Sequence, residues 1–238
     1  MVEGVRGIEE AHKRGIVPTK VFALMSGLPL RVERTLDAFA SAGVAITRIS
    51  VPEMRRLSDA DSSPGALALF RRPDQRFDAD VAANHSRALV LDTVADPGNL
   101  GAIIRSAVAF GFRLVLLVGD CADPFAPKVI RATAGAIFGV SIMRLNVSGL
   151  KDLARRTNAI IISAQPRGEK LADSTNLVRA QQRPIYLVLG SEAHGVSPEL
   201  MSIATARLTI PHEGDVESLN VVVAAGILMS HIFNAGRS

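Results

Sequence analysis

The sequence is poor in the residues on which disulfide frameworks, zinc modules and aromatic stacking surfaces depend. It contains one cysteine, Cys121, which excludes an intrachain disulfide, and its His and Cys residues are not spaced like zinc ligands. Tryptophan is absent and aromatic residues make up 4% of the chain, so base stacking on exposed rings is not expected to dominate recognition. We therefore predict no metal and a reducing, cytoplasmic setting.

Long apolar runs are missing as well. The N-terminus lacks the apolar core of a signal peptide, and the most apolar stretch, residues 219–232, is interrupted by Gly226 and His231. That stretch is too short to cross a bilayer, so we expect no membrane association.

The charge balance is weakly basic. Among 238 residues, 27 Lys and Arg stand against 23 Asp and Glu, which gives a net charge of +4. This balance is compatible with RNA, whose phosphates dominate affinity, but it is too small to require such a partner. The length suits one large or two modest domains with a buried core.

The most informative segment lies near the C-terminus. A polar loop at 210–220 ends on Ser218, Leu219 and Asn220 and continues into an apolar run at 221–229. A surface helix would show a polar face every 3.6 residues, and this run shows none, so we predict a buried helix. Asn220 or Ser218 would cap its free backbone N–H groups. A capped core helix without further function explains this segment equally well.

A second segment joins a strand to a turn that contains glycine. The apolar run 185–189 stops at Gly190, Ser191 and Glu192, and Gly195 follows. Glycine at a strand end permits the close approach of a ligand or of another backbone. A carboxylate there can bind a polar partner at the carboxyl edge of the sheet, where open α/β sheets keep their ligands. A simple turn with a solvated glutamate is the alternative.

A third segment leads from a strand at 88–91 through an Asp-Pro-Gly turn into a helix that begins near Asn99. Apolar residues recur on one face over 103–108, and Arg105 lies just off that stripe. An arginine on the buried side of a helix, beside a loop, suggests phosphate or carboxylate binding because its fork suits bidentate acceptors. An arginine that only covers the helix edge is the alternative.

Together, and in this order along the chain, the three segments resemble the SpoU/TrmH branch of the SPOUT methyltransferases. The motifs that carry the resemblance are Asn99-x-Gly-x-x-x-Arg105, Leu189-Gly190-Ser191-Glu192-x-x-Gly195, and Ile210-Pro211 through Ser218-Leu219-Asn220. Ala193 is one departure, because the family often has glycine at that position.

Strands and helices alternate from Ser86 onward, which predicts an α/β domain with a parallel sheet covered by helices on both faces. The expected strands are 88–91, 114–118, 160–164, 185–189 and 207–210. The resemblance implies the SPOUT α/β-knot, a parallel sheet with a deep C-terminal trefoil knot. No Gly-x-Gly-x-x-Gly follows the first of these strands, so a Rossmann-type cofactor site is not expected.

We divide the chain into a small α/β domain at 1–72, a linker at 73–86 and a methyltransferase domain at 87–238. The small domain is expected to contain helices at 5–14, 31–42 and 52–57, strands at 21–25, 44–51 and 66–70, and a turn at 61–65. Through Gly4-Val5-Arg6 and the segment 63–68 it resembles the ribosomal-protein-L30-like domain that binds substrate in many SpoU-type enzymes.

The resemblance implies an enzyme that transfers a methyl group from S-adenosylmethionine to a ribose 2′-hydroxyl of RNA. Catalytic roles would belong to Arg105, Asn99, Glu192, Ser218 and Asn220. The cofactor would be held by Leu189, Gly190, Ile210, Ser218, Leu219 and Asn220. Contacts with RNA are expected from Arg6, Arg14, Arg71, Arg72 and Arg105. The family's sites are typically built across a homodimer, with Arg105 of one subunit approaching the cofactor of the other.

The chemistry raises the question of which group accepts the proton of the 2′-hydroxyl as it attacks. Arg105 is the family's proposed base, but a free guanidinium stays protonated, with a pKa above about 12. We therefore assign Arg105 to positioning the phosphate and orienting the hydroxyl. His194 and His212 lie in the motif loops and are alternatives for the proton acceptor, although each fits an ordinary loop residue better.

Ribosomal RNA is the expected substrate, because the leading domain resembles those of ribosomal-RNA enzymes, and transfer RNA is the second choice. A non-catalytic RNA-binding or ribosome assembly factor on the same scaffold is the competing class, against which the retained polar residues of the motifs argue. A ligand-binding α/β domain unrelated to RNA is a more distant alternative. Phe110, Phe112 and the C-terminal helix fit either a dimer interface or a core.

Overall fold

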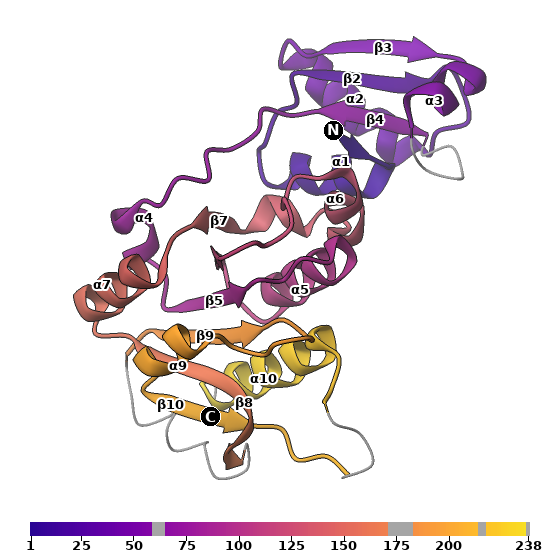
Figure 1. Ribbon diagram of the computed structural model, residues 1–238. Helices are drawn as coiled ribbons and strands as arrows, with labels where there is room; N and C mark the ends of the chain where they lie inside the picture. Colours follow the sequence, from indigo (N-terminus) through magenta and orange to yellow (C-terminus); the bar gives the residue numbers. More distant parts are fainter. Residues whose placement is uncertain (59–64, 171–182, 214–217, 237–238) are drawn as a thin grey trace. The chain divides into compact units, whose positions relative to one another are not determined.

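The computed structural model describes residues 1–58, 65–170, 183–213 and 218–236, and its chain divides into two compact units (Figure 1). The first unit comprises Met1–Pro73 together with Pro127–Gly139, and the second comprises Asp74–Ala126 with Val140–Ser238. Each unit has its own sheet.

The first unit is built on a four-stranded sheet in the order β1-β4-β2-β3. Its strands are β1 (Val2–Glu3), β2 (Lys20–Leu24), β3 (Ala45–Ile49) and β4 (Ala66–Leu69). Its helices are α1 (Val5–Lys13), α2 (Leu30–Ser41), α3 (Val51–Leu57), α6 (Pro127–Thr133) and the 3₁₀ helix η1 (Ala136–Gly139). Strand β2 pairs with β3 in parallel and with β4 in antiparallel orientation.

Local chemistry explains where two helices of this unit begin and end. After α2, Gly43 adopts a φ of 82°, the left-handed conformation that closes helices at least cost. At the start of α3, Ser50 and Glu53 form a capping box in which the Ser50 backbone N–H donates to Glu53 Oε2 at 2.8 Å. The hydrogen bonds that the Ser50 hydroxyl and the Ser50 backbone N–H donate to Glu53 Oε2 lower the pKa of Glu53. The helices and strands expected between residues 5 and 58 are confirmed, and the expected turn at 61–65 lies almost entirely outside the described residues.

The segment 127–139 packs with the first unit, although its position in the sequence lies within the expected methyltransferase domain. The ring centroids of Phe70 and Phe138 lie 4.7 Å apart. Arg131 Nη1 lies 3.6 Å from Oε1 of Glu3, and the Glu3 side chain is almost wholly buried. The expected linker contains a short helix, α4 (Ala79–Ala83), capped by Asp78. The backbone N–H groups of Asp80 and Val81 donate to Asp78 Oδ1. This cap stabilises the first turn and explains why so polar a segment forms a helix.

The second unit is a six-stranded sheet in the order β10-β8-β9-β5-β6-β7, with all neighbours parallel. Its strands are β5 (Arg87–Asp92), β6 (Leu114–Val118), β7 (Ser141–Arg144), β8 (Ile160–Lys170), β9 (Ile185–Gly190) and β10 (Ala206–Thr209). Its further helices are α5 (Pro97–Ala109), α7 (Val147–Thr157), α9 (Pro198–Ile203) and α10 (Val221–Ala235). The parallel sheet and all five of its expected strands are confirmed, while β7 was not anticipated.

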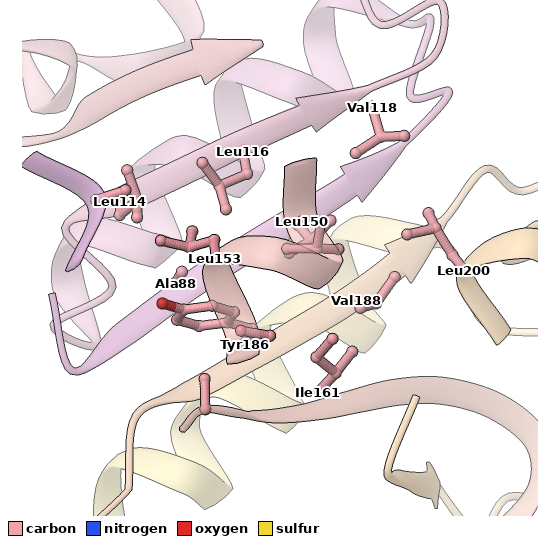
Figure 2. Close-up of a cluster of buried hydrophobic side chains, with 14 of the residues drawn as sticks. Ala88, Leu114, Leu116, Val118, Leu150, Leu153, Ile161, Tyr186, Val188 and Leu200 are labelled. Carbon is pink, nitrogen blue, oxygen red and sulfur yellow. The ribbon is translucent and has the colours of Figure 1, made fainter. Parts of the chain in front are cut away.

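Helices cover both faces of this sheet (Figure 1). On one face, alternate residues of the central strands pack against α7 and α9. Figure 2 shows Ala88, Leu116 and Val188 of the strands in one cluster with Leu150 of α7 and Leu200 of α9. On the other face lie α5 and α10, which contact each other. Because side chains alternate along a strand, strands buried on both faces become continuous apolar runs, as the sequence shows at 114–118.

Two expectations about burial are wrong in detail, and one alternative that the sequence left open is decided. Helix α10 is not buried all round, because Val223 is 50% exposed and Ile227 is 37% exposed. Arg105 lies on the exposed side of α5, since the helix turns Ile103 and Ile104 toward the sheet. Phe112 is fully buried and belongs to the core, which removes it as a candidate interface residue. None of the described helices is long and apolar enough to cross a membrane.

Tyr186 supplies a test of the core. Its ring is fully buried among the side chains of Figure 2, and its hydroxyl lies 3.0 Å from Thr157 Oγ1. Tyr186→Phe should lower the free energy of unfolding by about 1 kcal/mol, the value of one hydrogen bond. Tyr186→Ala should lower it by about 3–5 kcal/mol because it also leaves a cavity. Chemical denaturation at neutral pH measures both, and equal losses would contradict this packing.

The same residue predicts a dependence on pH. Burial raises the pKa of Tyr186, so the unfolded chain, with a tyrosine pKa near 10, loses this proton first as the pH rises. Stability contributed by Tyr186 is therefore complete below about pH 10 and is lost above it. The wild type should lose more stability than Tyr186→Phe between pH 9 and 11, and parallel curves would refute the prediction.

Candidate active site

A cavity of about 430 Å³ lies in the second unit, at the carboxyl ends of its strands. Its walls come from the ends of β8, β9 and β10, the loop at 190–196, and the first turns of α10. Drug-sized ligands occupy cavities of about 300–1,000 Å³, and open α/β sheets bind ligands at this edge. The lining combines apolar side chains with glycine and a few polar groups, which suits a ligand with an apolar ring and a polar end.

Glu192 joins the three motif segments at one carboxylate. Its Oε2 accepts a hydrogen bond from Asn99 Nδ2 at 3.3 Å, and its Oε1 accepts from Asn220 Nδ2 and from the Val221 backbone N–H, the latter at 3.4 Å. Negative charge is favourable at the N-terminus of α10, because the first backbone N–H groups of a helix have no acceptor within the helix. Asn220 also caps α10, because its Oδ1 accepts from the Val222 N–H at 2.9 Å. This confirms Asn220 as the cap residue.

Two glycines, Gly190 and Gly195, determine the conformation of the loop after β9. A side chain at Gly190 would overlap the Gly195 carbonyl group and the Val196 nitrogen, so only glycine fits there. Gly195 adopts a φ of 66°, and its N–H donates to the Ser191 carbonyl at 2.8 Å. Ala193 needs no left-handed conformation, which explains how the loop accommodates alanine where the family often has glycine.

Asp92 fixes the same loop from the neighbouring strand. It ends β5, its residue is 5% exposed, and its Oδ2 accepts from the Ser197 backbone N–H at 2.7 Å. Its Oδ1 accepts from Thr93 Oγ1 at 3.1 Å. The carboxylate thereby holds the far end of the β9 loop against the strand that leads to Asn99, a role the sequence analysis missed. The sequence did offer one signal for this role, because Asp92 directly follows the expected strand at 88–91.

Most of the expected site residues come together. Leu189, Gly190, Ile210, Ser218, Leu219 and Glu192 line the cavity. Asn99 and Asn220 join it through Glu192. Arg105 does not line it and forms no ion pair among the described side chains. His194 and His212 do line it, and His212 Nδ1 lies 2.9 Å from the Ile210 carbonyl oxygen.

The expected RNA-binding arginines of the first unit lie on its surface. Arg6, Arg71 and Arg72 are exposed. Arg14 is exposed as well, but its Nε donates to Glu10 Oε1 at 2.9 Å, so part of its charge is already paired. Among the described residues, no group of three or more His, Cys, Asp or Glu side chains is placed to hold a metal ion.

Gln165 is a further polar residue of the cavity that the sequence analysis missed. It follows Ala164 on β8, in the part of the strand where pairing with β10 changes register between Arg207 and Leu208. Its Nε2 is buried and has no hydrogen-bond partner among the described residues. Buried polar groups are nearly always paired, so this amide fits a site that a ligand completes.

Comparison with known proteins agrees with this geometry. The family model "SpoU rRNA Methylase family" matches residues 86–230. The 23S rRNA (guanosine(2553)-2'-O)-methyltransferase RlmP of Bacillus subtilis is 28% identical over 233 residues, which cover 98% of this chain and 87% of that protein. An uncharacterized tRNA/rRNA methyltransferase of Synechocystis is 34% identical over 147 residues, which cover 61% of this chain. That match spans only about half of the Synechocystis protein, 52% of its length.

A solved structure gives the same result for the fold. The AdoMet-bound rRNA methyltransferase from Sinorhizobium meliloti superposes with a TM-score of 0.81 at 25% identity, covering 98% of this chain and 86% of that one. The fold and the site define an α/β methyltransferase domain of the SPOUT type. The chain belongs to the SpoU rRNA methylase family, a class of RNA methyltransferases that use S-adenosylmethionine.

Gly190→Ala tests the cavity directly. The added methyl group would push the loop at 191–196 off the end of β9, so affinity for S-adenosylhomocysteine should fall by at least about tenfold, as isothermal titration calorimetry would measure. Gly149→Ala, at the start of α7 and away from the cavity, is the matched control and should bind normally. Normal binding by Gly190→Ala would show that the loop is not part of the site.

Proposed function

We propose that this chain transfers the methyl group of S-adenosylmethionine to a ribose 2′-hydroxyl of ribosomal RNA. The observation that carries the proposal is the Glu192 carboxylate, which joins Asn99, Asn220 and the N-terminus of α10 beside a cavity of about 430 Å³. The resemblance of the motifs and the ribosomal-RNA substrate in the name of the Bacillus relative support the choice of substrate.

The residues of the cavity fit the cofactor. Leu189, Ile210 and Leu219 offer apolar walls for its base, and Gly190 leaves the backbone open to approach. The unpartnered Gln165 amide fits a polar ligand. When bound, S-adenosylmethionine supplies a methyl group on a positively charged sulfonium, which makes the transfer intrinsically easy. Alignment of the attacking hydroxyl can then supply most of the rate.

Roles follow from where the side chains lie. Glu192 and Asn220 would hold the loops in place, and Asn99, bound to the same carboxylate, would position the RNA. Ser218 lines the cavity beside them. Arg105 is exposed and free to bind a phosphate and orient the hydroxyl. His194 and His212 remain the alternatives for the proton acceptor, because both line the cavity.

The first unit is proposed to capture RNA as an L30-like domain, through Arg6, Arg14, Arg71 and Arg72. Its mixed sheet and exposed arginines support this role. We propose that the second unit contains the trefoil knot of the SPOUT fold. The proposed domain boundaries are a substrate-binding domain at 1–72, a linker at 73–86 and a methyltransferase domain at 87–238. We also propose that the protein acts in the cytoplasm and that it holds no metal ion.

A homodimer is proposed through α10. Val223 and Ile227 are exposed apolar residues one helical turn apart, so they form a stripe that a second copy of the chain can cover. Arg105 of one subunit would then serve the cavity of the other, which accounts for its absence from the cavity wall of its own chain.

Arg105→Ala tests the enzymatic role. With labelled S-adenosylmethionine and unmodified ribosomal or transfer RNA, methyl transfer should fall at least about 100-fold, because hydroxyl orientation is lost. Binding of S-adenosylhomocysteine should stay unchanged, and Arg105→Lys, which keeps the charge without the fork, should recover little activity. Primer extension that is sensitive to 2′-O-methylation maps the product.

The outcomes separate the alternatives. One wild-type stop in ribosomal RNA, absent in Arg105→Ala, supports the proposal. A stop in transfer RNA would overturn the substrate. Cofactor binding without label in either RNA would favour an RNA-binding or assembly factor, and no cofactor binding at all would exclude the enzyme.

Val223→Asp tests the dimer. A charge in the centre of the stripe would be buried without a partner at the interface, so light scattering should find monomers where the wild type forms dimers. Val81→Asp is the matched control, because Val81 is also exposed, at 40%, but lies on α4. Equal masses for Val223→Asp and the wild type would place the interface elsewhere.

A further inference from the structure

We propose that Thr93 is a positioning residue for methyl transfer, which acts by fixing the chain segment that leads from β5 to Asn99. This inference rests on the proposed function and adds one residue to it. Thr93 directly follows β5, is exposed, and does not line the cavity. It therefore acts on the reaction through its neighbours in the structure and not by touching the cofactor.

The backbone of Thr93 is strained. Its φ is 55°, a left-handed conformation that brings Cβ close to the following carbonyl oxygen. Among the described residues, Ala134 and Asn158 are the other non-glycine residues with a positive φ, at 49° and 53°. Asparagine tolerates this conformation and alanine is not branched, so Thr93 is the β-branched residue that carries it. Such strain persists only where the surroundings enforce it, and it is concentrated at active sites.

Hydrogen bonds to the loop after β6 hold Thr93 and the next residue in place. The Thr93 N–H donates to the Val118 carbonyl at 3.0 Å. The Val94 N–H lies 3.4 Å from Cys121 Sγ, and the Val94 carbonyl accepts from the Ala122 N–H at 3.0 Å. These contacts enforce the conformation of Thr93, which sets the direction in which the chain leaves β5.

The Thr93 side chain satisfies one oxygen of a buried carboxylate. Thr93 Oγ1 donates to Asp92 Oδ1 at 3.1 Å, and the Ser197 N–H donates to Asp92 Oδ2 at 2.7 Å. A Cβ atom at Gly119 would lie only 2.6 Å from Thr93 Oγ1, so the hydroxyl also packs closely against the loop after β6. Because each carboxylate oxygen has its own donor, the Thr93 hydroxyl helps to orient the group that fixes the end of the β9 loop.

The direction set at Thr93 reaches the reaction through Asn99. The segment between these residues is short, and its far end is fixed because the Asn99 N–H donates to Asp96 Oδ1 at 2.7 Å. A change of direction at Thr93 therefore moves Asn99 relative to Glu192, whose Oε2 lies 3.3 Å from Asn99 Nδ2. A misplacement of about 1 Å can cost about 100-fold in rate, so Thr93 should affect the rate of transfer more than the affinity for the cofactor.

Thr93→Val and Thr93→Ser test the hydroxyl. Thr93→Val keeps the branched shape but leaves Asp92 Oδ1 without this donor, so kcat for the RNA that the wild type methylates should fall about tenfold. The dissociation constant of S-adenosylhomocysteine should stay close to the wild-type value, because Thr93 does not line the cavity. Thr93→Ser keeps the hydroxyl and should recover most of the wild-type kcat. Normal kcat in Thr93→Val would overturn the role of Thr93.

Thr93→Gly tests the backbone conformation. Glycine adopts left-handed and right-handed conformations about equally, so this variant loses both the hydroxyl and the fixed direction of the chain. Its kcat should be at least about threefold below that of Thr93→Val. Equal kcat values in the two variants would overturn the role of the conformation.

Two matched controls lie at the end of α7. Asn158→Gly releases another left-handed residue, and Thr157→Val removes another threonine hydroxyl, whose Oγ1 donates to the Leu153 carbonyl at 2.9 Å. Neither residue lines the cavity, and both variants should keep the wild-type kcat. A loss in either control as large as that in Thr93→Val would overturn the specific role of Thr93.

Hydrogen exchange at the Ser197 amide, measured by NMR, tests the same contacts without RNA. This N–H is bound to Asp92, so it should exchange at least about tenfold faster in Thr93→Val and at the wild-type rate in Thr93→Ser. Unchanged exchange in Thr93→Val would overturn the link from Thr93 to the β9 loop. If the wild type methylates neither ribosomal nor transfer RNA, the proposed function itself fails. Wild-type methylation with an unchanged kcat in Thr93→Val overturns this inference alone.

Discussion

One carboxylate holds the site together. Glu192 accepts hydrogen bonds from Asn99, which follows β5, and from Asn220 and the Val221 N–H, which begin α10. Those segments lie 93 and 28 residues away in the sequence, so their loops have no local reason to meet. A charged acceptor strengthens each bond, and the N-terminus of α10 favours its negative charge. The carboxylate therefore ties the three segments together beside the cavity, at the edge where the parallel strands end.

The frame around Glu192 makes that convergence possible. Gly190 has no room for a side chain, so β9 can end directly against Gly195 and Val196. Asp92 holds the Ser197 N–H from the neighbouring strand and thereby fixes where the loop ends. The parallel sheet, buried on both faces, keeps β5 and β9 in register and fixes the distance that Glu192 must bridge. The packed sheet thus makes this part of the molecule rigid, and the few hydrogen bonds fix the positions of its loops.

Sequence patterns predicted the parts of this design that depend on local chemistry. Apolar runs predicted five strands of the parallel sheet, and Ser218-Leu219-Asn220 before an apolar run predicted the cap of α10. They failed where the answer depends on distant neighbours. An all-apolar helix looked fully buried, yet Val223 is 50% exposed and Ile227 is 37% exposed. The role of Asp92 depends on strand order, which no spacing along the chain reveals.

A double-mutant cycle on cofactor affinity tests the central claim that Glu192 and Asn220 act as one unit. The dissociation constant of S-adenosylhomocysteine would be measured for the wild type, Glu192→Ala, Asn220→Ala and the double variant. Because each substitution breaks the same tie, the double variant should lose little more affinity than the worse single variant. Losses that multiply would show that the two residues act independently and would contradict the account of the site given by the Glu192 carboxylate.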